Sequence, residues 1–157
     1  MLGYLLPQQI EEVLASELVG RIGCHADDET YVIPISYGYD GTYVYCHTTE
    51  GKKLQMMRKN PKICFQVDNM KDMGNWKSVL LQGQFEEVKE KEQRTAAMQV
   101  LVDRHLPIIS SSKTHLGEHW PFSPDNLNDI NGVVFRIAIH HKTGRFESSE
   151  ASPSIPG

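Results

Sequence analysis

The residues best suited to chemistry gather in one stretch of the sequence, where an apolar run ends in a polar cluster. Gly51 then opens a predicted helix that carries two lysines in its first turn. The start of a helix presents free N–H groups and a positive dipole end, and lysines are unfavourable there unless an anion offsets their charge. The stretch therefore predicts a phosphate site, with a solvated polar turn as the alternative. Its candidate residues are His47, Thr48, Thr49, Lys52 and Lys53.

His47 is the candidate catalytic residue, because an imidazole can donate a hydrogen bond or exchange a proton near neutral pH. The other histidines do not predict a metal site. His140 and His141 are adjacent, so on a strand they point to opposite faces. His115 and His119 have helical spacing, but the HExxH pattern is absent and the surrounding glycine and prolines disfavour a helix.

Two other stretches could contact a planar ligand. Pro34 interrupts residues 30–39, and a strand with a proline leaves backbone groups unpaired that a polar ring could use. Trp76 could cover such a ring, and Lys77 and Ser78 could reach a phosphate or a ring oxygen. The alternatives are an edge strand with stacked tyrosines and an ordinary barrel strand with exposed polar residues.

The elements that must position these residues are mostly strands. Alternation and β-branched content predict six of them, and the Asp40–Gly41 pair predicts a hairpin. Gly83 is expected at a bulge or close approach. Strands joined mainly to their sequence neighbours predict a mainly β fold, an antiparallel barrel or sandwich with peripheral helices. The strands are residues 18–25, 30–39, 42–48, 62–67, 76–88 and 133–140. The helices are a short one from Pro7, then residues 51–59 and 89–104.

Composition narrows the function classes. The 157 residues carry 39% hydrophobic and 23% charged residues with a net charge of -4, which is typical of one globular domain and gives no basic field for nucleic acid. No apolar stretch approaches the ~20 residues of a membrane span, and no signal peptide is recognisable, so we expect a cytoplasmic protein. Three cysteines, all in apolar runs, predict buried thiols rather than a disulfide framework.

The order of these pieces resembles the pyridoxamine 5'-phosphate oxidase-like superfamily of FMN-binding split barrels. The resemblance covers residues 5–105 best, and within the superfamily the chain is most similar to the nitroimidazole-resistance (Nim-type) branch. The matching pieces are Gly20-Arg21, Tyr31 to Gly41 with Pro34, Tyr45 to His47, Gly51 to Leu54, Asn60-Pro61, Ser78-Val79 and Gly83, with a weaker match at Thr143-Gly144-Arg145.

The resemblance implies a six-stranded antiparallel split β-barrel over residues 1–147, a loose tail over 148–157, and a homodimer with FMN at its interface. In such proteins a strand resembling Pro34, Ile35, Ser36 and Tyr37 lies along the isoalloxazine ring. The positions of His47, Thr48, Thr49, Lys53 and Lys52 hold the phosphate and ribityl chain, and those of Lys77, Ser78 and Val79 come from a neighbouring strand. Trp76 is a candidate to cover the ring.

The implied function is an FMN-dependent oxidoreductase that takes electrons from NAD(P)H and reduces a small acceptor, with nitroaromatics attributed to the Nim-type branch. The chain lacks the basic C-terminal segment of the oxidase proper, so oxidation of vitamin B6 is not expected. Two other functions remain open. Some split barrels bind haem, and a flavin-binding module without turnover would carry the same site.

Overall fold

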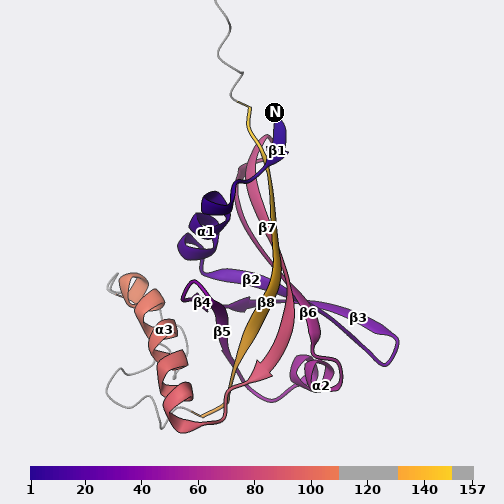
Figure 1. The fold of residues 1–157 in the computed structure, drawn as a ribbon, viewed down its shortest axis with the longest axis vertical. Helices are drawn as coiled ribbons and strands as arrows, with labels where there is room; N and C mark the ends of the chain where they lie inside the picture. Colours follow the sequence, from indigo (N-terminus) through magenta and orange to yellow (C-terminus); the bar gives the residue numbers. More distant parts are fainter. Residues whose placement is uncertain (110–130, 150–157) are drawn as a thin grey trace, which may run out of the picture.

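Eight antiparallel strands in one curved sheet make up most of the computed structural model, which describes residues 1–109 and 131–149 (Figure 1). The sheet order is β3-β2-β6-β7-β8-β5-β4, and β1 pairs with the end of β8. The strands are β1 (Leu2–Tyr4), β2 (Val19–Ala26), β3 (Glu29–Ser36), β4 (Gly38–Tyr39), β5 (Tyr43–Thr48), β6 (Lys62–Asp72), β7 (Asn75–Glu87) and β8 (Val133–Glu147).

The strands form because apolar and polar residues alternate along them. In β6, for example, Ile63, Phe65 and Val67 are buried while the residues between them lie on the opposite face. Gly20 on the neighbouring strand has no Cβ, which would otherwise approach the Phe65 ring to 2.3 Å. The inward residues of β2, β5, β6, β7 and β8 thereby share one hydrophobic core.

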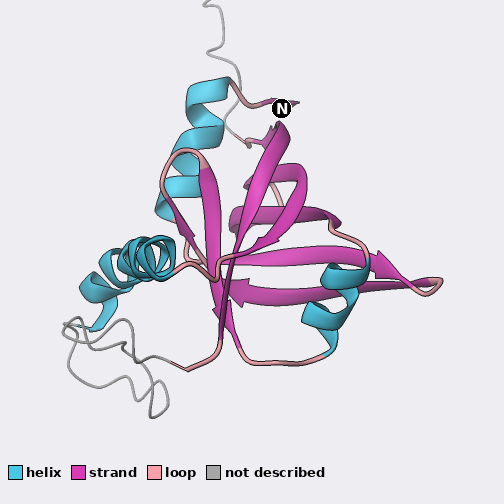
Figure 2. Cartoon of the chain, turned by 60° about the horizontal axis from the view of Figure 1, so that its bottom comes forward, coloured by secondary structure: helices cyan, strands magenta, loops and turns pink. Residues whose placement is uncertain are grey.

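Three helices lie around the described strands (Figure 2). Helices α1 (Pro7–Ser16) and α2 (Lys52–Lys59) contribute residues such as Leu14 and Leu54 to the main core. Helix α3 (Lys91–Ile109) packs on the other side of the sheet, where Met98, Leu101 and Val134 form a second core. No helix in the described residues is both long and apolar enough to span a membrane.

The predicted fold class is confirmed, with two short strands added to the six expected. The expected second strand, residues 30–39, is divided in two: β3 ends at Ser36, and Gly38–Tyr39 forms β4, which pairs with β5 instead of β2. Both β6 and β8 run longer than expected, because their polar ends still pair with β7. Gly83 lies at a register shift, and a Cβ there would come within 2.5 Å of the Ala138 carbonyl oxygen, so its predicted bulge is confirmed.

Candidate functional site

Among residues 1–109 and 131–149 the outer edge of β3 is free, because β3 is the last strand of the sheet and pairs only with β2. The Tyr37 N–H donates to the Leu18 carbonyl (3.0 Å), and the register continues unbroken from this pair. Since hydrogen-bonded and non-bonded pairs alternate in an antiparallel ladder, Pro34 faces the free edge with its nitrogen and breaks no ladder bond. The N–H and C=O groups of Val32 and Ser36 face the same edge, and no described strand pairs with them there.

The two lysines at the start of α2 have different surroundings. Lys52 Nζ lies 2.5 Å from Glu29 Oε1 and 5.0 Å from the centre of the Tyr31 ring, so it is paired with the beginning of β3. Lys53 makes no ion pair or hydrogen bond within residues 1–109 and 131–149. Burial raises the pKa of the Cys46 thiol and the charge of Lys53 opposes this, which places the ammonium within electrostatic reach of β5.

The start of α2 is open. A Cβ added to Gly51, the N-cap residue, would meet nothing within 4 Å, and no side chain caps the first turn. Thr48 is half-buried and Thr49 is exposed, and the Thr48 hydroxyl donates a weak hydrogen bond of 3.4 Å to the Thr49 carbonyl. The first N–H groups of the helix, the two hydroxyls and the Lys53 ammonium are therefore the candidate groups for binding an anion here.

His47 lies on the other face of β5 from its neighbour Thr48. Tyr45, two residues earlier, packs against the core beneath α3, and the strand period places His47 on the same face. Its Nε2 lies 2.6 Å from the Asn131 carbonyl oxygen, so this nitrogen carries the proton and donates it. Gly132 follows with φ +109, and a Cβ there would approach His47 Nε2 to 2.7 Å. The imidazole thus ties β5 to the start of β8.

Trp76 and Lys77 lie far from the start of α2 within one chain. Thr48 pairs with Val133 and Trp76 pairs with Glu147, the two ends of the fifteen-residue β8. At about 3.3 Å per residue these ends are roughly 45 Å apart along the strand. Figure 1 shows the start of β7 near the top of the molecule and α2 near the bottom. The Trp76 indole N–H donates to Glu147 at 3.0 Å, and Lys77 is exposed.

The remaining predicted residues divide between the surface and the core. Pro34 and Ser36 are exposed on the outer face of the sheet, and Ser78 lies on the same face, where it accepts a hydrogen bond from Gln66 (3.0 Å). Ile35 packs partly against the main core. Tyr37 and Val79 are fully buried. Tyr37 donates its hydroxyl to the Leu14 carbonyl (2.7 Å) and packs edge-on against Phe65, so its side chain does not reach the surface.

The cysteines differ slightly from expectation. All three are free thiols, with Cys24 and Cys46 buried and Cys64 half-buried on the outer face of β6. The spaced pair His115 and His119 lies outside the described residues. Sequence reasoning missed Arg58, Glu50 and Glu87, which form an ion network beside the start of α2. No spacing pattern signals it, because Glu87 comes from a distant strand.

The fold defines a small barrel-like β protein whose candidate anion site is the start of α2, near a strand edge that is unpaired among the described residues. The chain belongs to the pyridoxamine 5'-phosphate oxidase family, whose model matches residues 7–146.

Solved structures support the fold assignment. The chain is similar to an FAD-binding protein from Mesorhizobium loti, with 30% identity, a TM-score of 0.71, and coverage of 94% of this chain and 99% of the other. A candidate 5-nitroimidazole antibiotic resistance protein from Bacteroides thetaiotaomicron shares the fold at 18% identity and a TM-score of 0.69, covering 93% and 87%.

Among curated proteins, the chain is similar to an uncharacterised protein of Rhizobium meliloti. The two are 33% identical over 81 residues, which is 52% of this chain and 54% of that protein. The match therefore spans about half the length of the curated relative.

Proposed function

We propose that the protein binds FMN between two copies of the chain and uses it as an oxidoreductase. The observation that carries this proposal is the unpaired Lys53 at an open helix start, beside a free strand edge, in a member of this family. Relatives of similar fold are named as FAD-binding proteins, which supports a flavin in general. The monophosphate form and the redox activity belong to the proposal.

The phosphate end of FMN fits the start of α2. A phosphate there would accept hydrogen bonds from the first N–H groups of the helix and from the hydroxyls of Thr48 and Thr49, and would pair with Lys53. Lys52 is held by Glu29, so it contributes its charge from the side rather than as a direct partner. One direct lysine with backbone donors suffices for such a site.

The ring end fits the edge of β3. Lys52 contacts Tyr31, so the helix start borders the beginning of this strand, and Pro34 lies three residues further along. A flavin ring carries donors and acceptors around its rim, and the free backbone groups of Val32, Pro34 and Ser36 are complementary to them. In this proposal Tyr37 and Val79 support the site from the core, because their side chains are buried.

A second copy of the chain would complete the site. The outward surface of β3, β2, β6 and β7, called the bare face from here on, has none of the three described helices over it and exposes Val19 (44%), Val32 (70%) and Leu80 (38%). A groove of about 580 Å³ crosses it, lined by Gly23, Val32, Cys64 and Gln82 among others. Two copies joined on this face could bring Trp76, Lys77 and Ser78 of one chain toward the helix start of the other, which a single chain does not do.

Bound flavin would supply the hydride and electron chemistry, and the chain would orient it and exclude water. We assign NAD(P)H as the reductant and a small acceptor as substrate, with nitroaromatics as the Nim-type candidate. His47 lies on the face of β5 opposite Thr48, on the same side as Tyr45. Its Nε2–H is engaged with the Asn131 carbonyl, so we propose that it holds the start of β8 in place and passes a proton only when that bond opens.

The first experiment is an absorbance titration of the purified protein with FMN, FAD and haem. Shifted flavin bands with micromolar FMN support the proposal, and tighter binding of FAD would replace FMN as the cofactor. A Soret band with no flavin binding would favour the haem alternative. NAD(P)H oxidation with and without nitroaromatic acceptors then separates an oxidoreductase from a flavin-binding module without turnover.

The neighbouring lysines provide a matched pair of variants. We expect Lys53→Ala to weaken FMN binding by about 2 kcal/mol, roughly 30-fold in Kd, because a charge-assisted contact to phosphate is lost. Lys52→Ala should change Kd less than about threefold, since Lys52 already pairs with Glu29. Equal effects of the two variants, or no effect of Lys53→Ala, would contradict the assigned phosphate site.

A further inference from the structure

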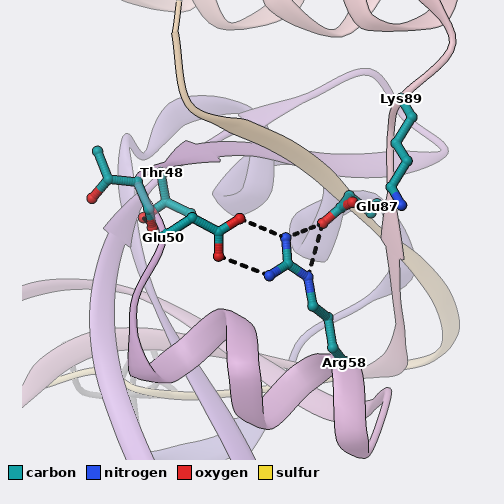
Figure 3. A network of polar contacts seen from close by, with 6 residues as sticks. Thr48, Glu50, Arg58, Glu87 and Lys89 are labelled. Carbon is teal, nitrogen blue, oxygen red and sulfur yellow. Dashed lines mark hydrogen bonds and ion pairs between the residues drawn. The ribbon is translucent and has the colours of Figure 1, made fainter.

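Arg58, in the last turn of α2, binds two carboxylates from different parts of the chain (Figure 3). Its Nη1 and Nη2 atoms donate to the two oxygens of Glu50 at 2.7 and 2.9 Å, a two-pronged pairing that fixes direction as well as distance. Its Nε and Nη2 atoms also donate to Glu87 Oε1, at 3.0 and 2.5 Å. Lys89 lies 3.2 Å from the other oxygen of Glu87.

The network links a weakly held segment to a firmly held one. Glu87 ends β7, pairs with β8 through Phe135, and its side chain is only 16% exposed. Glu50 lies in residues 49–51, the connection between β5 and α2. The N-cap Gly51 makes no side-chain cap bond, and the Gly51 carbonyl accepts the first helical bond, 3.2 Å from the Gln55 N–H. Among the described residues, Arg58 therefore joins this connection to the end of β7 through its contacts with Glu50 and Glu87.

The same contact also controls charge. Glu50 is a carboxylate one residue before the N-cap Gly51, where an uncompensated negative charge would repel a bound phosphate. Hydrogen bonds from Arg58 lower the pKa of Glu50, so the carboxylate stays ionised and stays directed at the guanidinium. Figure 3 shows Glu50 turned toward Arg58 and Glu87.

We propose that Arg58 is the positioning residue of the anion site: by holding Glu50 against Glu87, it shapes residues 49–51 and keeps the Glu50 charge away from the phosphate. This inference rests on the proposed function, because it assigns the phosphate of FMN to the start of α2. Arg58 itself acts only through Glu50. It thereby sets how strongly the protein prefers a phosphorylated flavin over an unphosphorylated one.

The test compares the affinities of FMN and riboflavin, which differ only in the phosphate. We expect Arg58→Ala to weaken FMN binding at least about tenfold and riboflavin binding less than twofold, with Arg58→Lys intermediate because an ammonium cannot form the two-pronged contact. Lys59→Ala is the matched control, since Lys59 is the next residue and pairs with Asp27 at 2.5 Å instead. It should leave both affinities unchanged. Equal losses for both flavins in Arg58→Ala would overturn the proposal.

A double-mutant cycle tests the route through Glu50. The double variant Glu50→Gln, Arg58→Ala should bind FMN better than the sum of the single effects predicts, because the uncompensated carboxylate is gone. Strict additivity would show that Arg58 acts independently of Glu50 and would overturn the proposal. Thermal unfolding of each variant confirms that it is folded before binding is measured.

A measurement without ligand separates this inference from the proposed function. Amide hydrogen exchange of residues 49–53 should speed up in Arg58→Ala and stay unchanged in Lys59→Ala. If the wild-type protein binds no flavin but this exchange difference is found, the cofactor assignment fails while the positioning role stands. Unchanged exchange in Arg58→Ala would overturn the positioning role whatever the flavin result.

Discussion

The two halves of the sheet have the same inner core but different outer surfaces. Over β4, β5 and the first part of β8, α3 covers the outer surface and buries a second core of Val88, Ala97, Met98, Leu101, Val102 and Val134. Over β3, β2, β6 and β7 no described helix covers it, and Val32 and Leu80 are exposed. A polar network of Arg21, Asp68, Gln66 and Ser78 lies on that bare face.

The difference shows where each half obtains its stability. The outer surface of the covered half is buried by α3 of the same chain, so its residues stabilise the fold of that chain. The bare half leaves apolar side chains and a half-buried polar network at the surface, a combination that marks interaction sites. Substitutions in the covered half should therefore change unfolding, and substitutions on the bare face should change association and ligand binding.

The largest expected effect comes from the core beneath α3. Leu101 is 2% exposed, and Leu101→Ala should lower the free energy of unfolding by about 2–5 kcal/mol through lost burial and the cavity left behind. Urea denaturation followed by circular dichroism measures this change. A loss below about 1 kcal/mol would mean that α3 contributes little, and that the two halves do not differ as described.

The bare face should respond differently. Val32→Glu places an unpaired charge in the proposed dimer interface and should weaken the dimer by about 2–3 kcal/mol, roughly 30- to 150-fold in Kd, without lowering the stability of the isolated chain. Analytical ultracentrifugation over a concentration series measures it. Met73→Glu is the control, because Met73 is 91% exposed and lies in the turn between β6 and β7. A wild-type monomer at all concentrations would contradict the interface.

The smallest effect concerns the contact of α1 with β4 and the later part of β8. Glu11 accepts hydrogen bonds from Lys142 (2.5 Å) and Tyr39 (2.6 Å). Burial alone would raise the pKa of Glu11, but these bonds and the Lys142 charge hold it below its ordinary value of 4.5. A lowered pKa stabilises the fold above pH 4.5 and loses that stability as the pH falls through the folded-state value.

Glu11→Gln should thus cost less than about 1 kcal/mol at pH 7, because the pair is partly exposed. The difference from the wild type should shrink as the pH falls below about 4.5 and disappear once Glu11 is protonated in the folded state. Urea unfolding at several pH values follows this change, and a difference that does not shrink in acid would show that the contact stabilises by packing rather than by charge.

The sequence predicts the strands well where one face is buried, because alternation then repeats over several residues. It fails at the ends: β1 is three residues long, and the outer part of the β6–β7 hairpin is exposed and polar, so neither carries a periodic signal. The break at Tyr37 also escapes prediction. Tyrosine suits a strand, and the sequence does not show that the next two residues, Gly38 and Tyr39, change partner from β2 to β5.

Part of the candidate site could be predicted from the sequence. Local features could be recognised in the sequence: Gly51 before two lysines, and Pro34 in a strand that lies at the edge of the sheet. Contacts between distant elements were not. Sequence spacing does not show that Glu29 forms an ion pair with Lys52. It also does not show that Trp76 and Thr48 pair with opposite ends of β8. The binding roles of the predicted residues stay predictions until the variants above are measured.

The proline at the free edge of β3 has a consequence for how copies of this chain can meet. An unpaired strand edge is a template on which another chain can add a strand, extending one sheet into the next and, by repetition, into a fibre. Pro34 lacks the donor that such pairing needs at its own position and faces the open side. Continuous extension by backbone pairing is therefore interrupted there, which favours the proposed closed, face-to-face pair over a sheet that keeps growing.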